Sequence, residues 1–97
     1  MSAYVVAQIR IDDLDEYQLY LDSFYPSFER HGGELLATTR NSTEVMEGEW
    51  AYPSTVILKF PSLEAAHAWH ADPEYVTVAA HRHKAAKTNL VIVEGFS

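Results

Sequence analysis

The chain contains no cysteine. It therefore has no disulfide, no thiolate nucleophile and no cysteine-ligated metal site. Positive charge is also scarce, because seven lysine and arginine residues face fourteen aspartate and glutamate residues, for a formal net charge of −7. Nucleic acids and anionic membrane surfaces are recognised by clustered positive charge, so we expect neither as a partner.

Long apolar runs and glycine-rich loops are missing too. No stretch approaches the roughly 18 consecutive apolar residues of a membrane-spanning helix, and the first residues lack the basic flank and apolar run of a signal peptide. A cytoplasmic protein is therefore expected. The paired glycines Gly32-Gly33 lack the spacing of a phosphate loop or a dinucleotide fingerprint, and no serine lies in a Gly-x-Ser-x-Gly elbow. We expect no nucleotide cofactor, and no other cofactor is indicated.

What remains is a chain of 97 residues with 47% hydrophobic side chains, which is typical of one globular domain, residues 1–97, with one modest core. Alternating apolar residues predict strands, and apolar residues at the 3.6-residue spacing predict helices. Aspartate and serine caps, together with proline and glycine, mark the ends of these elements. The expected elements are a strand at Tyr4–Ile11, a helix capped by Asp13 with a kink or break near Pro26 and an end at Gly32-Gly33, strands at Glu34–Arg40 and Thr55–Phe60, a helix capped by Ser62 that restarts at Asp72-Pro73, and a strand at Leu90–Glu94.

Four shorter segments lie between these elements. Asn41-Ser42 has the composition of a turn, and Thr43–Glu47 is compatible with a short additional strand. Gly48–Ser54 is interpreted as a loop that carries aromatic residues. Thr88-Asn89 is expected to lie outside the last strand, because asparagine is unfavourable in sheets.

The order βαββαβ is the ferredoxin-like α+β arrangement, an antiparallel sheet with helices on one face and here a split second helix. The other face of such a sheet is open. It is too apolar in places to be left in water and too polar for an ordinary core, so we expect a homodimer, a dimeric α/β barrel with a space between its two sheets. The residues expected on the open face are Val6, Gln8, Arg10, Lys59, Leu90, Ile92 and Glu94.

An ordered set of motifs runs from Tyr4 to Gly95 and resembles the domain of unknown function 1330 family. The motifs are Tyr4–Arg10, Gly32-Gly33, Glu47–Trp50, Phe60–Ala66, Trp69, Asp72–Tyr75 and Glu94-Gly95. The resemblance implies a ferredoxin-like protomer that dimerises sheet to sheet, as in the dimeric α/β-barrel superfamily. Relatives in that superfamily include cofactor-independent monooxygenases, muconolactone isomerases, haem-dependent chlorite-dismutase-like enzymes and stress-response proteins. Arg82 stands where the family commonly has an arginine.

Four histidines suggest a metal site only on first inspection. His67 and His70 are three residues apart on a predicted helix and share a face, whereas His81 and His83 would diverge by about 200°. A metal needs three or four converging ligands, and no His-Glu-x-x-His pattern is present. We therefore interpret these residues as solvent-facing and predict no metal site.

The candidate ligand-binding residues are polar or aromatic groups expected around the space beneath the sheet. Trp50 follows a glycine in a loop and would either close a cavity or reach a partner subunit. The alternative for Arg10 and Lys59 is an ion pair with Glu94 across the strands, or solvation at the edge of the sheet. Trp69, Tyr75 and Phe24 are interpreted as core. The candidate set is Gln8, Arg10, Trp50, Lys59, Arg82 and Glu94, with Arg40 as a further polar candidate.

Two functions remain open. The first is a protein that binds or transforms a small organic acid or carbonyl compound, as a cofactor-independent isomerase or monooxygenase-like enzyme in which Arg10 or Arg82 holds an anionic oxygen. The second is a non-catalytic dimeric binding or stress-response module. No catalytic residue is assigned by the sequence. A buried cavity with a perturbed ionisable group favours the first, and a filled apolar core favours the second.

Overall fold

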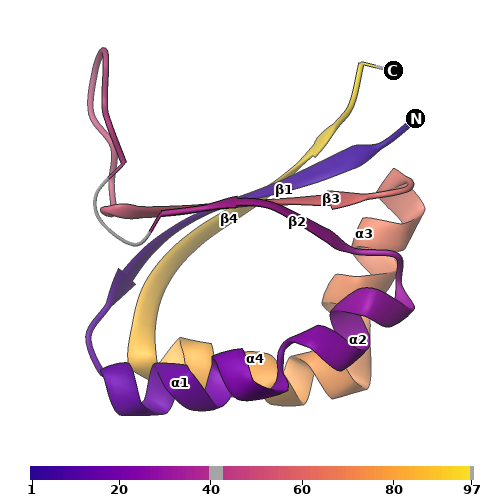
Figure 1. Cartoon of the computed structure of the whole chain (residues 1–97), viewed down its shortest axis with the longest axis horizontal. Coiled ribbons are helices and arrows are strands. Elements are labelled where there is room, and N and C mark those ends of the chain that lie inside the picture. The colour runs from indigo at the N-terminus through magenta and orange to yellow at the C-terminus, as the bar shows by residue number, and fades with distance from the viewer. Residues whose placement is uncertain (40–42, 97) are drawn as a thin grey trace.

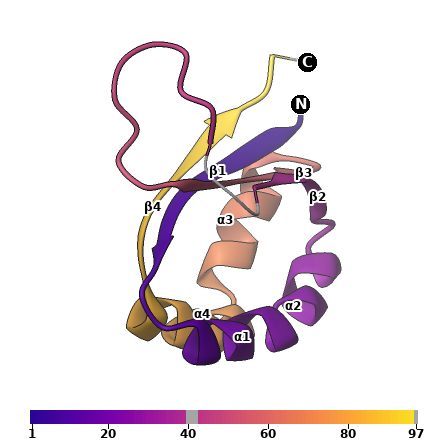
Figure 2. The ribbon, with the colours of Figure 1, turned by 60° about the vertical axis from the view of Figure 1, so that its left-hand side comes forward.

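The computed structural model describes residues 1–39 and 43–96, which form a four-stranded antiparallel sheet and four helices (Figure 1). The strands run across the sheet in the order β2-β3-β1-β4, and the helices all lie on one side of it (Figures 1 and 2). This is the predicted ferredoxin-like α+β arrangement. The elements are β1 (Ala3–Ile11), α1 (Leu14–Ser23), α2 (Tyr25–Arg30), β2 (Glu34–Thr38), β3 (Ser54–Phe60), α3 (Leu63–Ala71), α4 (Pro73–Ala85) and β4 (Ala86–Glu94).

The first helical segment is interrupted as predicted. The Asp13 side chain caps α1 by accepting a hydrogen bond from the Glu16 backbone N–H at 3.1 Å. The break falls at Phe24, and Pro26 lies in the first turn of α2, where its missing N–H costs nothing. Gly32 ends α2 with a φ of 78°, the left-handed geometry that glycine adopts without strain.

The second helical segment is split at Asp72, as the sequence predicts. Ser62 Oγ accepts a hydrogen bond from the Ala65 N–H at 3.0 Å and so caps α3. Asp72 ends α3, and its carboxylate accepts from the Glu74 N–H at 2.8 Å to begin α4. Each cap satisfies a backbone donor that the first helical turn leaves without a partner. Among the described residues, no helix has both the length and the apolar character needed to span a membrane.

The last strand is longer than predicted. β4 already begins at Ala86, so Thr88 and Asn89 lie within it rather than outside it, opposite Ile9 and Gln8 of β1. Pairing along the whole of β1 outweighs the low strand propensity of asparagine, because the ladder provides partners for the backbone groups of β4 that point toward β1.

The predicted extra strand at Thr43–Glu47 is absent from the structure, where this segment belongs to an irregular loop. β2 ends at Thr38, earlier than predicted. The predicted turn at Asn41-Ser42, and Arg40 with it, lie outside the described residues.

Strand register corrects the predicted composition of the open face. Val5 lies opposite Leu58 of β3 and Ile92 of β4, and directly opposed residues in an antiparallel pair project to the same face. Val5 is fully buried on the helix-covered face, so Ile92 shares that face with its neighbours two residues away, Leu90 and Glu94. These three were wrongly assigned to the open face because the alternation of β4 was read one residue out of step. The residues of β4 on the open face are Lys87, Asn89, Val91 and Val93.

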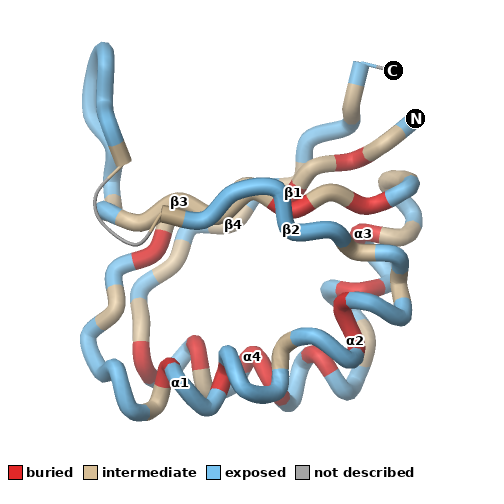
Figure 3. Tube along the Cα trace, in the orientation of Figure 1, coloured by how far each residue is buried: buried red, intermediate tan, exposed pale blue. Residues whose placement is uncertain are grey.

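Buried residues gather where the sheet and the helices face each other (Figure 3). Trp69 of α3 is 1% exposed and lies at the centre of an aromatic group. Its ring centroid is 4.2 Å from that of Tyr75, 5.1 Å from that of Phe60 and 6.2 Å from that of Phe28. This group fills one end of the layer between sheet and helices, and the space toward the other end is where the candidate site lies.

Candidate functional site

A cavity of about 550 Å³ lies between the helix-covered face of the sheet and the helices. Its volume falls within the range of small-molecule sites. Three exposed or half-exposed apolar side chains on α1, α2 and β2, those of Leu21, Tyr25 and Leu35, mark where it opens to solvent. The sheet contributes Val5, Ala7, Ile9, Val56 and Leu58 to its wall, and the helices contribute Tyr17, Tyr20, Phe24, Trp69 and Arg82.

The sequence creates this space by placing small side chains opposite large ones. Ala7 and Ser54 line the cavity from the sheet, where a leucine or phenylalanine would fill it. The rings of Tyr17 and Tyr20 of α1, and of Phe24 directly after it, recur at helical spacing and lie between the helix layer and the sheet. The result is a wall that is largely apolar, with its cation and phenols on the helix side and the hydroxyls of Thr38, Thr39 and Ser54 on the sheet side.

Arg82 is the charged residue of the cavity wall. It belongs to the inward stripe of α4, which includes Tyr75, Val78 and Ala79, and it is only 4% exposed. Its Nε is buried without a hydrogen-bond partner, and Arg82 forms no ion pair with a carboxylate in the part of the chain that the structure describes. A buried guanidinium is normally paired, so this one is available to a ligand.

Two tyrosines surround the guanidinium. The Arg82 Cζ lies 5.6 Å from the ring centroid of Tyr20, whose hydroxyl is 2.8 Å from the hydroxyl of Tyr75. Burial alone would lower the pKa of Arg82, but Tyr75 and Tyr20 outweigh burial and the pKa is raised. Arg82 therefore remains charged at physiological pH.

The phenols of the wall remain protonated. Burial, followed by the neighbouring Tyr75, raises the pKa of Tyr20 far above its ordinary value. Burial also raises the pKa of Tyr17. Such hydroxyls donate hydrogen bonds to oxygen at neutral pH and do not act as bases. The cavity thus combines one fixed cation with phenolic donors, a set suited to an oxygen atom that carries negative charge.

Of the six candidate residues from the sequence, the structure brings only Arg82 to this cavity. Gln8 lies on the open face and accepts a hydrogen bond from Asn89 at 3.2 Å, and Lys59 lies on the same face opposite Tyr4. Arg10 pairs with Asp12 at 3.1 Å, not with Glu94 as the alternative prediction had it. Trp50, at 41% exposure, is likewise remote from the cavity wall.

Glu94 lines a separate, more open groove of about 630 Å³ between α3 and β4. His67 and His70 border the same groove, on one helix face as their spacing predicts. His81 instead bonds Glu16 of α1 through its Nδ1 at 2.5 Å. Among the described residues, no three histidine or acidic side chains lie close enough together to hold a metal ion.

The phenols of the site were not recognised from the sequence. Tyr17 and Tyr20 fit the helical stripe of α1 and were read simply as part of it, and Tyr75 and Trp69 were interpreted as core. Trp69 is indeed in the core, yet it also lines the cavity. A usable signal was present, because a phenol on an inward stripe needs a polar partner inside the protein.

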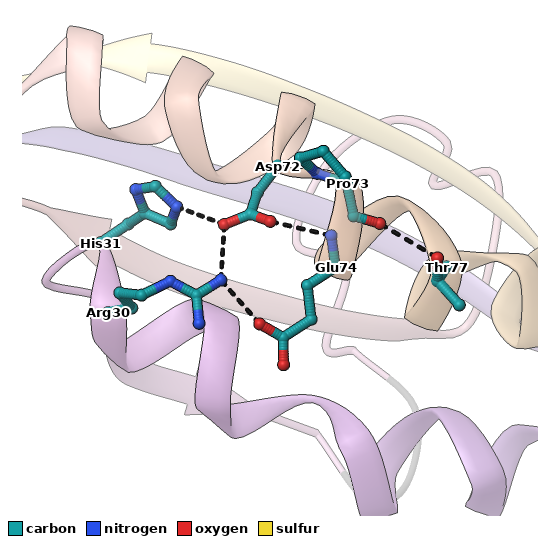
Figure 4. Close-up of polar contacts among 6 residues, drawn as sticks. All are labelled: Arg30, His31, Asp72, Pro73, Glu74 and Thr77. Carbon is teal, nitrogen blue, oxygen red and sulfur yellow. Dashed lines mark hydrogen bonds and ion pairs between the residues drawn. The ribbon is translucent and has the colours of Figure 1, made fainter.

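A second polar cluster lies within the helix layer, outside the lining of the cavity (Figure 4). The Asp72 carboxylate accepts hydrogen bonds from Arg30 at 2.7 Å and His31 at 2.8 Å, and Arg30 also contacts Glu74 at 2.7 Å. These bonds, that of His31 first, hold the pKa of Asp72 well below its usual range. The cluster joins the end of α2 to the beginning of α4, the helix that carries Arg82.

We expect Asp72→Asn to lower the melting temperature at pH 7 by roughly 5 °C, because the amide loses the charge-assisted bonds while keeping the cap. Since folding depresses the pKa of Asp72, its contribution is complete above the ordinary aspartate pKa of about 4 and is lost as the pH falls through the depressed value. The difference between wild type and variant should therefore shrink below pH 4 in thermal scans.

The control for this variant is Asp22→Asn, an exposed aspartate of α1 that bonds only Gln18 among the described residues. It should shift the melting temperature little at any pH. An Asp72→Asn curve that runs parallel to wild type down to pH 2 would contradict the assignment.

Solved structures share the fold at low sequence identity. A protein of unknown function from Rhodopseudomonas palustris is 19% identical, with a TM-score of 0.77 over 99% of this chain and 83% of that chain. A dimeric ferredoxin-like protein of unknown function from Jannaschia sp. CCS1 is 11% identical, with a TM-score of 0.67 over 98% of this chain and 100% of that chain. SnoaB, a cofactor-independent oxygenase from Streptomyces nogalater, is 12% identical, with a TM-score of 0.67 over 99% of this chain and 94% of that chain.

No curated protein matches the sequence. Residues 2–96, in contrast, match a family described as domain of unknown function (DUF1330). This match covers nearly the whole chain, including α1 and α4, which carry Tyr20 and Arg82. The protein therefore belongs to the DUF1330 family.

Proposed function

We propose that the protein binds a small organic acid or carbonyl compound in the cavity beneath its sheet, with an oxygen of the ligand held by Arg82. The observation that carries the proposal is a guanidinium with 4% exposure, no carboxylate partner among the described residues and a cavity beside it. Leaving such a cation unpaired costs free energy in the ligand-free protein, and an anionic oxygen recovers it. The apolar sheet face opposite would contact the carbon skeleton of the ligand.

A transformation of this ligand would proceed without a nucleotide cofactor, as an isomerisation or an oxygenation. SnoaB, with a related fold, is a cofactor-independent oxygenase, which makes this chemistry compatible with the architecture. Arg82 and Tyr20 would stabilise an enolate oxygen. Neither Tyr20 nor Arg82 takes up a proton at neutral pH, so the proton lost when the enolate forms would pass to water at the open end of the cavity, and the substrate would need an acidic C–H bond. An oxygenation would use molecular oxygen as its oxidant. The non-catalytic alternative uses the same contacts for binding alone.

We propose further that the chain forms a homodimer through the open face of its sheet. Val91 and Val93 are 53% and 51% exposed on that face, and Val6 and Ile57 beside them are half-buried. Two solved structures of the same fold, from Jannaschia and Thermobifida fusca, are described as dimeric ferredoxin-like proteins. A second copy on this face would remove these side chains from water.

The ligand site can be tested with 2-naphthoate, a rigid aromatic carboxylate that the cavity can contain, by calorimetry and amide chemical-shift mapping. Arg82→Gln should weaken its binding about 10- to 100-fold, since a charge-assisted hydrogen bond contributes about 1.5–3 kcal/mol. The neutral 2-naphthamide should bind wild type and variant alike.

The matched control is Lys84→Gln, which removes the same charge from an exposed position two residues along α4. It should leave 2-naphthoate binding unchanged. Equal binding to wild type and Arg82→Gln, or no binding to wild type at millimolar concentration, would refute the proposed site.

A further inference from the structure

The loop between β2 and β3 projects away from the body of the protein on the open side of the sheet (Figures 1 and 2). We call its described part, Thr43–Pro53, the arm. The Thr43 N–H bonds the Pro53 carbonyl at 2.8 Å, and the Trp50 indole N–H bonds Thr55 Oγ1 at 3.1 Å. Arg10 of β1 lies 5.8 Å from the ring centroid of Tyr52. These contacts fix the base of the arm to the sheet, so the arm has a defined direction.

The arm presents apolar and acidic side chains to solvent. Met46 is 89% exposed, Val45 is 45% exposed and Trp50 is 41% exposed. Around them stand three glutamates, and none of these enters an ion pair with any residue that the structure describes. Large apolar side chains held clear of the core, together with carboxylates, are typical of a surface that meets a partner. The glutamates are Glu44, Glu47 and Glu49.

The open face of the sheet has the complementary composition. Val91 and Val93 supply an apolar strip, as described above. The basic residues of the face are Arg10, Lys59 and Lys87, and Lys59 lies opposite Glu34 of β2 on this face. Arg10 and Lys87 lie directly opposite each other across β1 and β4, and opposed like charges destabilise a sheet. Asp12 contacts only the first of this pair. A set of carboxylates arriving over this face would relieve the repulsion.

We propose that the arm of one copy docks on the open sheet face of a second copy, with Met46 on the apolar strip and Glu47 and Glu49 near the lysines. This proposal rests on the homodimer proposed above. Because each chain carries both an acidic, apolar arm and a basic, apolar face, a two-fold axis produces the same contact twice. It also places the ring of Trp50, whose indole N–H bonds Thr55 within its own chain, beside the partner.

The absence of native cysteine and the presence of only three lysines permit a direct test. Met46→Cys introduces a unique thiol, which a short maleimide–succinimidyl ester reagent joins to a nearby amine. We expect a covalent dimer on a denaturing gel, and peptide mass spectrometry should find the introduced thiol linked to Lys59 or Lys87. Lys84 lies on α4, on the opposite side of the sheet, and should remain unlinked. The control is Ala80→Cys, an exposed position of α4, which should give no link to Lys59 or Lys87.

Light scattering on the same samples separates the two proposals. A mass of two 11.0 kDa chains, without a link from the thiol at position 46 to Lys59 or Lys87, overturns the proposed docking of the arm but is consistent with the proposed dimer. A mass of one chain overturns both, and leaves the ligand site to be judged by 2-naphthoate alone. If the arm makes this contact, the dissociation constant of the dimer should rise about tenfold in the double variant Glu47→Lys, Glu49→Lys. The control Glu29→Lys, on α2, should leave it unchanged.

Discussion

Replacing Trp69 with alanine should lower the free energy of unfolding by about 3–5 kcal/mol. Trp69 is 1% exposed, and its ring contacts the rings of Tyr75 and Phe60 at centroid distances of 4.2 Å and 5.1 Å. Truncation removes the largest buried side chain and leaves a void that these rings cannot fill from their fixed positions. Urea denaturation followed by circular dichroism measures the loss.

The control for Trp69→Ala is Leu19→Ala, which truncates an apolar side chain of α1 that is 46% exposed. That change should cost less than about 1 kcal/mol. Similar losses for the two variants would mean that Trp69 does not organise the core as its contacts indicate. The void also lies beside the cavity, so Trp69→Ala should change the amide spectrum of α1 and α4 as well as stability.

Replacing Arg82 with methionine should have opposite effects on stability and binding. Methionine has a flexible apolar side chain that fills the same space without a charge, and replacing buried ionic groups by apolar ones often stabilises a protein by about 1–4 kcal/mol. Tyr20 and Tyr75 keep a partner in the variant because their hydroxyls bond each other at 2.8 Å. We therefore expect an unchanged or higher free energy of unfolding in urea, and about a 100-fold loss of 2-naphthoate affinity.

This combination distinguishes a ligand site from a structural arginine. A guanidinium that served only to hold α4 in place would destabilise the protein when removed, because its former partners would be left buried and unsatisfied. A loss of more than about 2 kcal/mol in Arg82→Met, with Lys84→Met as the exposed control, would assign Arg82 to the core instead of the site.

The order of elements was predictable from the sequence because it depends on local chemistry. Asp13, Ser62 and Asp72 cap the helices that the sequence predicts them to cap, and Gly32 ends α2 in the left-handed geometry. Such signals act within a few residues, so the local sequence is enough to predict where these helices begin and end. The family was also predictable from the sequence: motifs spread from Tyr4 to Gly95 resemble it, and the family match covers residues 2–96.

The predictions of strand limits and of sheet faces failed where residues distant in the chain determine the structure. Thr88 and Asn89 belong to β4 because Ile9 and Gln8 of β1 lie opposite them. The strand propensities of Thr88 and Asn89 carry no information about this pairing. Glu94 was placed on the wrong face for the same reason, since a shift of one residue moves a whole strand to the other side. Thr43–Glu47, which has a plausible strand composition, has no strand to pair with and remains in the arm.

The amino-acid sequence by itself determined the ferredoxin-like order, the helix boundaries and the presence of an arginine at position 82, because caps, periodicity and breakers are local properties of the chain. Only the tertiary structure decided that Arg82 meets Tyr20 and Tyr75 at the wall of a cavity, while Gln8 and Lys59 lie on the other face of the sheet. Register and packing bring together residues more than fifty positions apart, such as the two tyrosines. Burial then raises the pKa of Tyr20, while the two tyrosines raise that of Arg82 against the effect of burial.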